Sequence, residues 1–189
     1  MKIKWIGKFD GNLPTAELPS TASPLGIATS KSALFAVPLL AIAVLFLLVK
    51  INTMGVRIDR TSFFIGIGIA LIFTAAHELL HAVCFPSGHE VIMYYTSMGL
   101  GITSIAPLSK KRFLLINLLP MVKLGIVPLI VWLFLPKDCV VVNSILFAFS
   151  FFHLGASYGD LQNITNAIRN VPKNATIQIS GDQIYWYEQ

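Results

Sequence analysis

The sequence is poor in charged residues. Asp, Glu, Lys and Arg together make up only 12% of the 189 residues, while 55% are hydrophobic and the mean hydropathy is +0.73. Soluble domains average about 25% charged residues. The shortage of charge therefore excludes an ordinary soluble domain and indicates an integral membrane protein.

Cysteine is also scarce. The two residues, Cys84 and Cys139, are expected at opposite sides of the membrane, so a disulfide between them would have to cross it. We expect both to be small core residues instead. Internal repeats and low-complexity tracts are missing too. No small-x-small cleavage pattern follows the first apolar run, so we expect a retained anchor and not a signal peptide.

Basic residues are in excess, but they are not arranged for nucleic acid. The net charge is +5, yet no basic stripe with interleaved aromatic residues appears. If both termini are cytoplasmic, nine Lys and Arg residues flank the apolar runs on that side and four on the other. This bias is the positive-inside pattern. We expect a multi-pass protein of the cell membrane with cytoplasmic termini, whose surroundings are the lipid bilayer.

Four apolar runs approach or exceed the length needed to cross a bilayer, about 20 residues. They are residues 33–49, 63–85, 113–135 and 140–158. The expected fold class is all-α integral membrane, with about four transmembrane helices and small β-hairpins in the cytoplasmic segments. The expected domains are an N-terminal strand and linker, the helical membrane domain, and a C-terminal hairpin tail, at residues 1–32, 33–170 and 171–189.

The terminal segments carry β patterns. Residues Lys2 to Phe9 read as a strand before an Asp10–Gly11 turn, and residues 175–180 and 183–188 alternate as a hairpin around Gly181–Asp182. A lone hairpin is marginal in water. We therefore expect the two ends to pair in one small sheet.

A second hairpin is expected between the second and third helices. Residues 90–96 and 100–105 are rich in β-forming side chains and are separated by Ser97-Met98-Gly99. An exposed edge of such a hairpin can bind an extended peptide by strand addition.

The stretch TAAHELLHAV, residues 74–83, places three ionisable groups in an apolar run. The spacing puts His77 and His81 on one helix face, where both can reach a zinc ion at about 2.1 Å. Glu78 is rotated by about 100°, so it can take a proton from a water that the metal acidifies. His77 lies about 12 Å inside the helix end at Phe85. Because unpaired ionisable groups are costly there, we favour a metal site over a polar helix end.

Catalytic zinc usually has three protein ligands. We expect Asp160 to be the third, because the fourth helix brings it to the same side of the membrane as the two histidines. His153 is rotated by about 20° from Asp160. It could be a ligand, a support for a ligand, a transition-state donor or a core histidine. His89 and Glu90 are expected to be solvated in a loop.

The third helix contains Asn117-Leu118-Leu119-Pro120. The structural interpretation is a kink whose freed carbonyl is satisfied by neighbours. The functional interpretation is that Asn117 faces the site and donates to a substrate or an oxyanion. Lys123, near mid-membrane, either pairs within the bundle or extends along its surface.

Three motifs together resemble a known group. HELLH at 77–81, NLLP at 117–120 and the late aspartate of GASYGD at 155–160 resemble the site-2-protease clan of membrane zinc metallopeptidases, and more closely the bacterial putative zincin peptidase family. The resemblance covers roughly residues 60–170. It implies that His77, His81 and Asp160 bind Zn²⁺, that Glu78 is the catalytic base, and that Asn117 is the asparagine of the N-x-x-P element.

The expected function is therefore a membrane-embedded zinc metallopeptidase that hydrolyses peptide bonds of a membrane or membrane-adjacent protein substrate. Two alternatives remain at this point. One is a non-enzymatic membrane protein with a structural or partner-binding metal site. The other is a transporter that uses His77, Glu78 and Asp160 as a metal or proton path, which four short helices without repeat symmetry disfavour.

Overall fold

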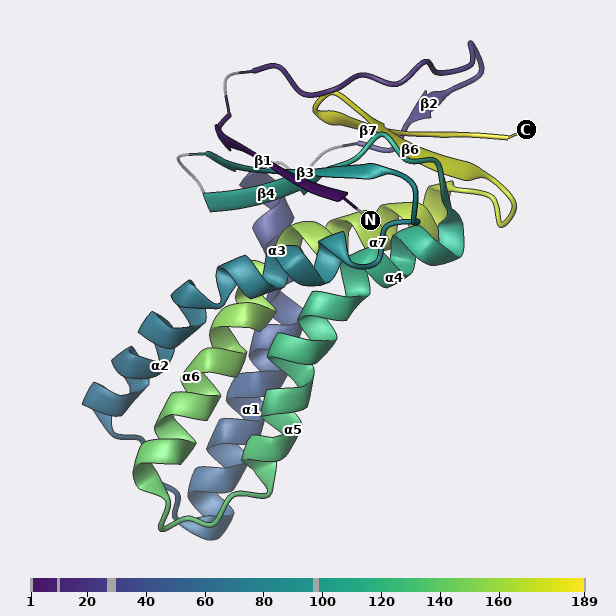
Figure 1. The fold of residues 1–189 in the computed structure, drawn as a ribbon. Coiled ribbons are helices and arrows are strands. Elements are labelled where there is room, and N and C mark those ends of the chain that lie inside the picture. The colour runs from purple at the N-terminus through teal and green to yellow at the C-terminus, as the bar shows by residue number, and fades with distance from the viewer. Residues whose placement is uncertain (1, 10, 27–29, 97–98, 189) are drawn as a thin grey trace. The chain divides into compact units, whose positions relative to one another are not determined.

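A computed structural model describes residues 2–9, 11–26, 30–96 and 99–188 (Figure 1). The chain forms two compact units, each built from separate stretches of sequence. We call them the helical unit, which contains residues 30–74 and 120–161, and the sheet unit, which contains residues 1–29, 75–119 and 162–189. The expected Asp10 turn and the Ser97-Met98 turn lie outside the described residues.

The helical unit consists of apolar helices. Lipid offers no partner to backbone N–H and C=O groups, so such sequences satisfy these groups within helices. Its core holds Trp132, Phe147 and Leu154. The elements, in chain order, are η1 (Ser30–Phe35), α1 (Val37–Met54), α2 (Arg60–Ile72), the π-helical turn η2 (Met121–Ile126), α5 (Val127–Leu133) and α6 (Val140–Ala156).

Two helices of this unit approach each other closely at a glycine. A Cβ placed on Gly66 of α2 would lie 2.5 Å from the Ile145 carbonyl oxygen and 2.9 Å from the Ala148 Cβ of α6. A Cβ on Gly68, two residues further along α2, would meet nothing within 4 Å. Small residues permit this kind of helix packing where no hydrophobic effect holds helices together.

Among the described residues, three helical stretches are long and apolar enough to cross a membrane: Val37–Met54, Arg60–Ala82 and Lys110–Leu133. A fourth is possible if α6 and the following helix, α7 (Tyr158–Asn170), form one broken span, since they are bent by 47°. This agrees with the expected number of about four. Helix continues beyond the fourth apolar run to Asn170, with an interruption at Ser157.

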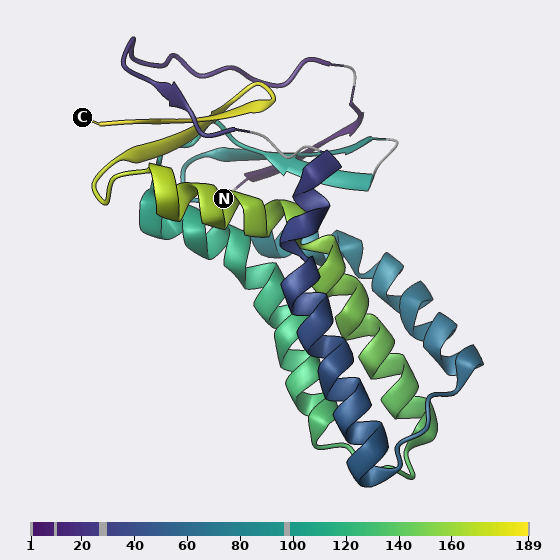
Figure 2. The same ribbon diagram turned by 180° about the vertical axis from the view of Figure 1, so that it is seen from behind.

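The sheet unit contains two sheets, visible from opposite sides in Figures 1 and 2. In the first, β1 (Lys2–Lys8) runs parallel to β3 (Glu90–Thr96), which forms a hairpin with β4 (Gly99–Thr103). The second has the order β2-β7-β6-β5, made of β2 (Ser23–Pro24), β7 (Gln183–Tyr187), β6 (Thr176–Ser180) and β5 (Leu108–Ser109). Both expected hairpins are present. The apolar helices of the expected class are present, but the class needs correction in one respect, because the seven strands of the described residues form two sheets and not only small hairpins.

The expected pairing of the two chain ends is only partly correct. The N-terminal strand pairs with β3, and only Ser23–Pro24 pairs with the C-terminal hairpin. Side-chain contacts accompany the pairing of β1 with β3, since Lys2 and Lys4 lie 3.7 and 4.0 Å from the Glu90 carboxylate and Trp5 stacks on Tyr95. A strand pattern identifies a strand but not its partner.

The core of the sheet unit joins helices to both sheets. Its buried residues include Ala82, Phe113 and Ala167 from helices and Val91 and Ile177 from strands. The helical residues belong to α3 (Thr74–Ala82), α4 (Lys110–Pro120) and α7. This packing sets helix α3, which carries the HExxH motif, against a folded support.

Two expectations about single side chains need correction. Both cysteines are free, as expected, but Cys139 is exposed and is not a core residue. Lys50 is one of the four basic residues expected to flank the apolar runs on the other side, but it is 3% exposed, and its ammonium group donates to the Trp132 carbonyl and to Asn143 Oδ1. Lys123 is exposed, which favours extension along the surface over a pair within the bundle.

Candidate metal centre

The three residues of the HExxH motif lie together on α3. His77 and His81 are each 7% exposed and Glu78 is half-buried. One ligand atom from each residue lies within 4.8 Å of the other two. The imidazole rings are 4.9 Å apart between centroids, with planes inclined by 71°. The motif therefore brings two imidazoles and the Glu78 carboxylate together, while their convergence with the Asp160 carboxylate stays a prediction.

One of the two histidines is held by a backbone group. The Nδ1 atom of His81 lies 2.8 Å from the carbonyl oxygen of Ile116 in α4. A carbonyl oxygen only accepts hydrogen bonds, so Nδ1 carries a proton, and in the neutral ring Nε2 then has the lone pair that a metal needs. Metal-binding histidines usually make this kind of second hydrogen bond.

Next to Ile116, Asn117 is buried and engaged on both sides of its amide. Its Nδ2 donates to the Phe113 carbonyl at 2.8 Å, and its Oδ1 accepts from Asn163 Nδ2 of α7 at 2.9 Å. One of its two amide hydrogens remains beyond these bonds. The expected role of Asn117 as a donor to substrate is untested. Asn163 was not identified as a site residue from the sequence, because a polar residue on an amphipathic helix is normally expected to face water.

Helices α4 and α7 lie side by side in both views (Figures 1 and 2). A second tie joins them, because Lys110 at the start of α4 donates to the Val171 carbonyl just after α7, at 2.6 Å. A cation beside the C-terminus of a helix is favourable for its dipole. Two hydrogen bonds therefore join α7 to α4, one from Asn163 to Asn117 and one from Lys110 to the carbonyl of Val171, just after the end of α7.

Electrostatics connect the motif with the first sheet. Burial raises the pKa of Tyr94 in β3, and the negative charge of Glu78 raises it further. The Tyr94 ring lies over Gly101 of β4, where an added Cβ would come within 3.0 Å of it. Phe9 packs against the same ring at 5.5 Å. Tyr94 thus stays protonated near Glu78, and no motif in the sequence pointed to it.

The other expected site residues are placed in different surroundings. Asp160 is half-buried in the first turn of α7 and belongs to the helical unit, so its role as third ligand stays a prediction. His153 is fully buried in α6, where its ring packs against Phe149 and Phe152. Its four possible roles also stay predictions. Glu90 is not a loop residue, because it begins β3.

The donor set fits zinc. Two neutral imidazole nitrogens and a nearby carboxylate are the ligand types that zinc prefers. The hydrogen bond between His81 and Ile116 is of the kind that metal-binding histidines usually make. His77 and His81 would hold the ion, with Glu78 beside it.

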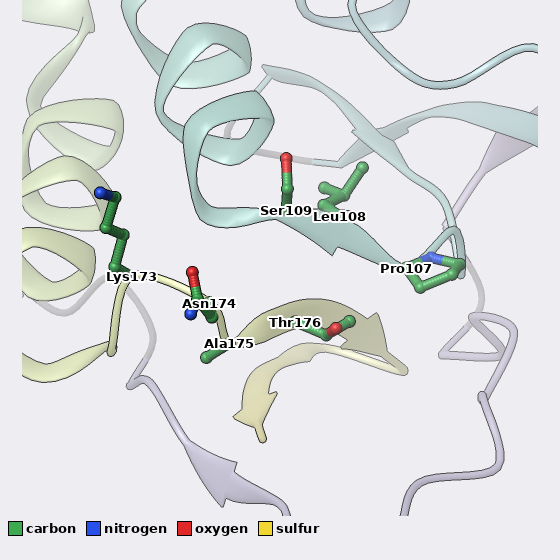
Figure 3. Close-up of a pocket in the computed structure, with 7 residues that line it drawn as sticks. All are labelled: Pro107, Leu108, Ser109, Lys173, Asn174, Ala175 and Thr176. Carbon is green, nitrogen blue, oxygen red and sulfur yellow. The ribbon is translucent and has the colours of Figure 1, made fainter. Parts of the chain in front are cut away.

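A cavity of about 420 Å³ lies elsewhere in the sheet unit (Figure 3). It opens beside the short pair β5 and β6 and is lined by residues 107–109 and 173–176. None of the motif residues lines it. The cavity therefore does not belong to the metal centre.

Comparison with known proteins agrees with the geometry. A family profile described as "putative zincin peptidase" matches residues 70–176, which is 107 of the 189 residues and includes His77, Glu78, His81 and Asp160. No curated protein and no solved structure matches the chain. Zincin peptidases are zinc-dependent, and the HExxH group is present in this chain. With a match over more than half its length and the motif in place, this chain belongs to the putative zincin peptidase family.

Proposed function

We propose that this protein is a membrane-embedded zinc metallopeptidase that cleaves membrane or membrane-adjacent polypeptides. The observation that carries the proposal is the grouping of His77, Glu78 and His81 within 4.8 Å in a helical stretch apolar enough to cross a membrane. Ionisable groups in such a stretch are costly unless they serve a site. Family membership independently supports zinc-dependent peptide hydrolysis.

In this mechanism zinc, when bound, supplies a Lewis acid that acidifies water and polarises the peptide carbonyl. His77 and His81 would hold the ion, and the Ile116 carbonyl would keep the His81 ring in the ligating tautomer. Glu78 takes the proton from the attacking water and passes it to the leaving amine. Tyr94 remains a neutral neighbour that brings no second negative charge to Glu78.

We further propose Asp160 as the third ligand. Support comes from its position on α7, one turn before Asn163, at a spacing that puts both on the same side of the helix. Asn163 is bonded to Asn117, which follows the residue that holds His81. In Asp160→Asn, zinc affinity should fall sharply, whereas Asp182→Asn in the β6–β7 turn should leave it unchanged. Equal affinities would remove Asp160 from the site.

The first sheet supports a mode of substrate binding. Its strand order is β1-β3-β4, which leaves β4 at an edge of the described sheet. We propose that an extended substrate adds to this edge. Proline substitutions at β4 positions whose N–H points away from β3 should impair cleavage more than zinc binding. Unaffected cleavage in all such variants would remove this role.

The deciding experiment compares wild type with Glu78→Gln in detergent micelles, using bound zinc by elemental analysis and cleavage of a fluorogenic library of membrane-segment peptides. Glu78→Gln should keep zinc and lose cleavage by at least ~100-fold, which is the scale of general base catalysis. Glu90→Gln, in β3, is the matched control. Wild type that binds zinc but cleaves nothing, or equal cleavage by Glu78→Gln, would instead favour a metal site for structure or partner binding.

A further inference from the structure

The carbonyl group that orients His81 belongs to an unusual position in α4. In a regular helix the Ile116 carbonyl accepts from the N–H group four residues later. That residue is Pro120, which is fully buried inside the helix and has no N–H to donate. The helix continues past it into the π-helical turn η2. Pro120 therefore leaves the Ile116 carbonyl without its regular helical donor.

His81 uses the acceptor that Pro120 releases. Its Nδ1 atom lies 2.8 Å from the Ile116 oxygen, within the range of a good N–H···O hydrogen bond. The sequence indicates a freed carbonyl satisfied by a neighbour, and in the structure that neighbour is a side chain of the HExxH motif. The bond fixes both the tautomer and the direction of the ring.

We propose that Pro120 is a positioning residue of the metal centre, which acts by releasing the Ile116 carbonyl to the Nδ1–H group of His81. The inference rests on the proposed zinc site and adds a residue that does not touch the metal. It also gives a physical reason for a proline close after Asn117 in this helix.

Any other residue at position 120 would bring back an N–H group aimed at the same oxygen. The His81 ring would then share its acceptor or lose it, and the Nε2–H tautomer, which has no lone pair at Nε2, would become populated. Loss of such a supporting bond typically weakens metal affinity by about 10- to 100-fold. Helix formation itself should not suffer, because alanine and valine both complete the backbone bond.

The test uses Pro120→Ala and Pro120→Val in the full-length protein, each supplying the missing N–H. The matched control is Pro128→Ala in α5, a second helical proline of the same span, at a position that the HExxH contacts do not involve. Two readouts are needed: zinc affinity by competition with a chromogenic chelator, and the His81 tautomer by ¹⁵N NMR of the zinc-free protein.

We expect zinc to bind about 10- to 100-fold more weakly to both Pro120 variants, and wild-type affinity in Pro128→Ala. Zinc-free wild type should show the Nδ1–H tautomer of His81, and the variants a mixture. If alanine at 120 unfolds the protein, the larger valine side chain fills more of the proline's space and serves as the folded comparison.

Two outcomes would overturn the inference. One is an Nε2–H tautomer of His81 in zinc-free wild type, which needs no variant to detect. The other is unchanged zinc affinity in a folded Pro120 variant, while His81→Ala abolishes binding. Failure of the proposed function looks different, since wild type itself would then bind no zinc, or His81→Ala would bind it as well as wild type does.

Discussion

Asn163 of α7 donates a hydrogen bond to Asn117 of α4 across 2.9 Å, beside the residue that holds His81. Asn163→Leu would leave the buried Asn117 oxygen without this donor, at a cost of about 1–3 kcal/mol. We expect cleavage to fall while bound zinc is retained. The control is Asn166→Leu, one turn further along α7, whose amide bonds Leu25 instead. Equal losses in both variants would indicate a general role of the helix.

Helix packing in the helical unit predicts a contrast between two glycines of α2. Gly66→Ala would force a methyl group to within 2.5 Å of the Ile145 carbonyl oxygen, and such overpacking costs about 1–3 kcal/mol. Gly68→Ala meets nothing within 4 Å and should stabilise the helix by about 0.5–1 kcal/mol. Thermal unfolding in micelles measures both changes. Opposite signs are expected, and a stable Gly66→Ala protein would contradict the close helix contact.

The buried ammonium group of Lys50 predicts strong coupling with Asn143. Lys50 donates to Asn143 Oδ1 at 3.0 Å and lies 4.3 Å from the Trp132 ring centroid. Asn143→Leu removes an acceptor from a buried cation and should cost about 2–3 kcal/mol. In a Lys50→Met background the same change should cost less. A double-mutant cycle on unfolding free energies provides the measurement, and additive effects would show that the bond contributes little.

Tyr94 reports on the charge of Glu78. Burial and that charge both disfavour the tyrosinate, so both raise the Tyr94 pKa. Glu78→Gln removes only the second cause, so Tyr94 should ionise at a lower pH than in wild type while burial still keeps its pKa above the ordinary value. NMR titration of zinc-free protein labelled at tyrosine Cζ follows this directly. A shift in Glu90→Gln and none in Glu78→Gln would contradict the assignment.

Features that depend only on the spacing of nearby residues could be predicted from the sequence. Helical periodicity places His77, Glu78 and His81 together, and the apolar runs indicate the spans. Both hairpins follow from alternation and turn residues. These features need only the 3.6- and 2-residue repeats of regular structure.

Features that depend on distant partners were not predictable. The parallel pairing of β1 with β3 joins residues about 90 positions apart, and one sequence contains no signal for it. The same holds for three side-chain interactions, those of Asn163 with Asn117, of Tyr94 with Glu78 and of Lys50 with Asn143. Pro120 lies between these two cases. Its missing N–H group predicts that a carbonyl one turn earlier lacks its helical donor, but the sequence does not identify the side chain that donates to this carbonyl.

The sheet unit is assembled from the beginning, the middle and the end of the chain. Synthesis runs in one direction, so α3 with both histidines is made before α4 and α7. A nascent chain that already carries both histidines still lacks α7 and the support it gives Asn117. The hydrogen bond that supports Asn117 beside the proposed metal centre therefore forms only after α7 has been synthesised.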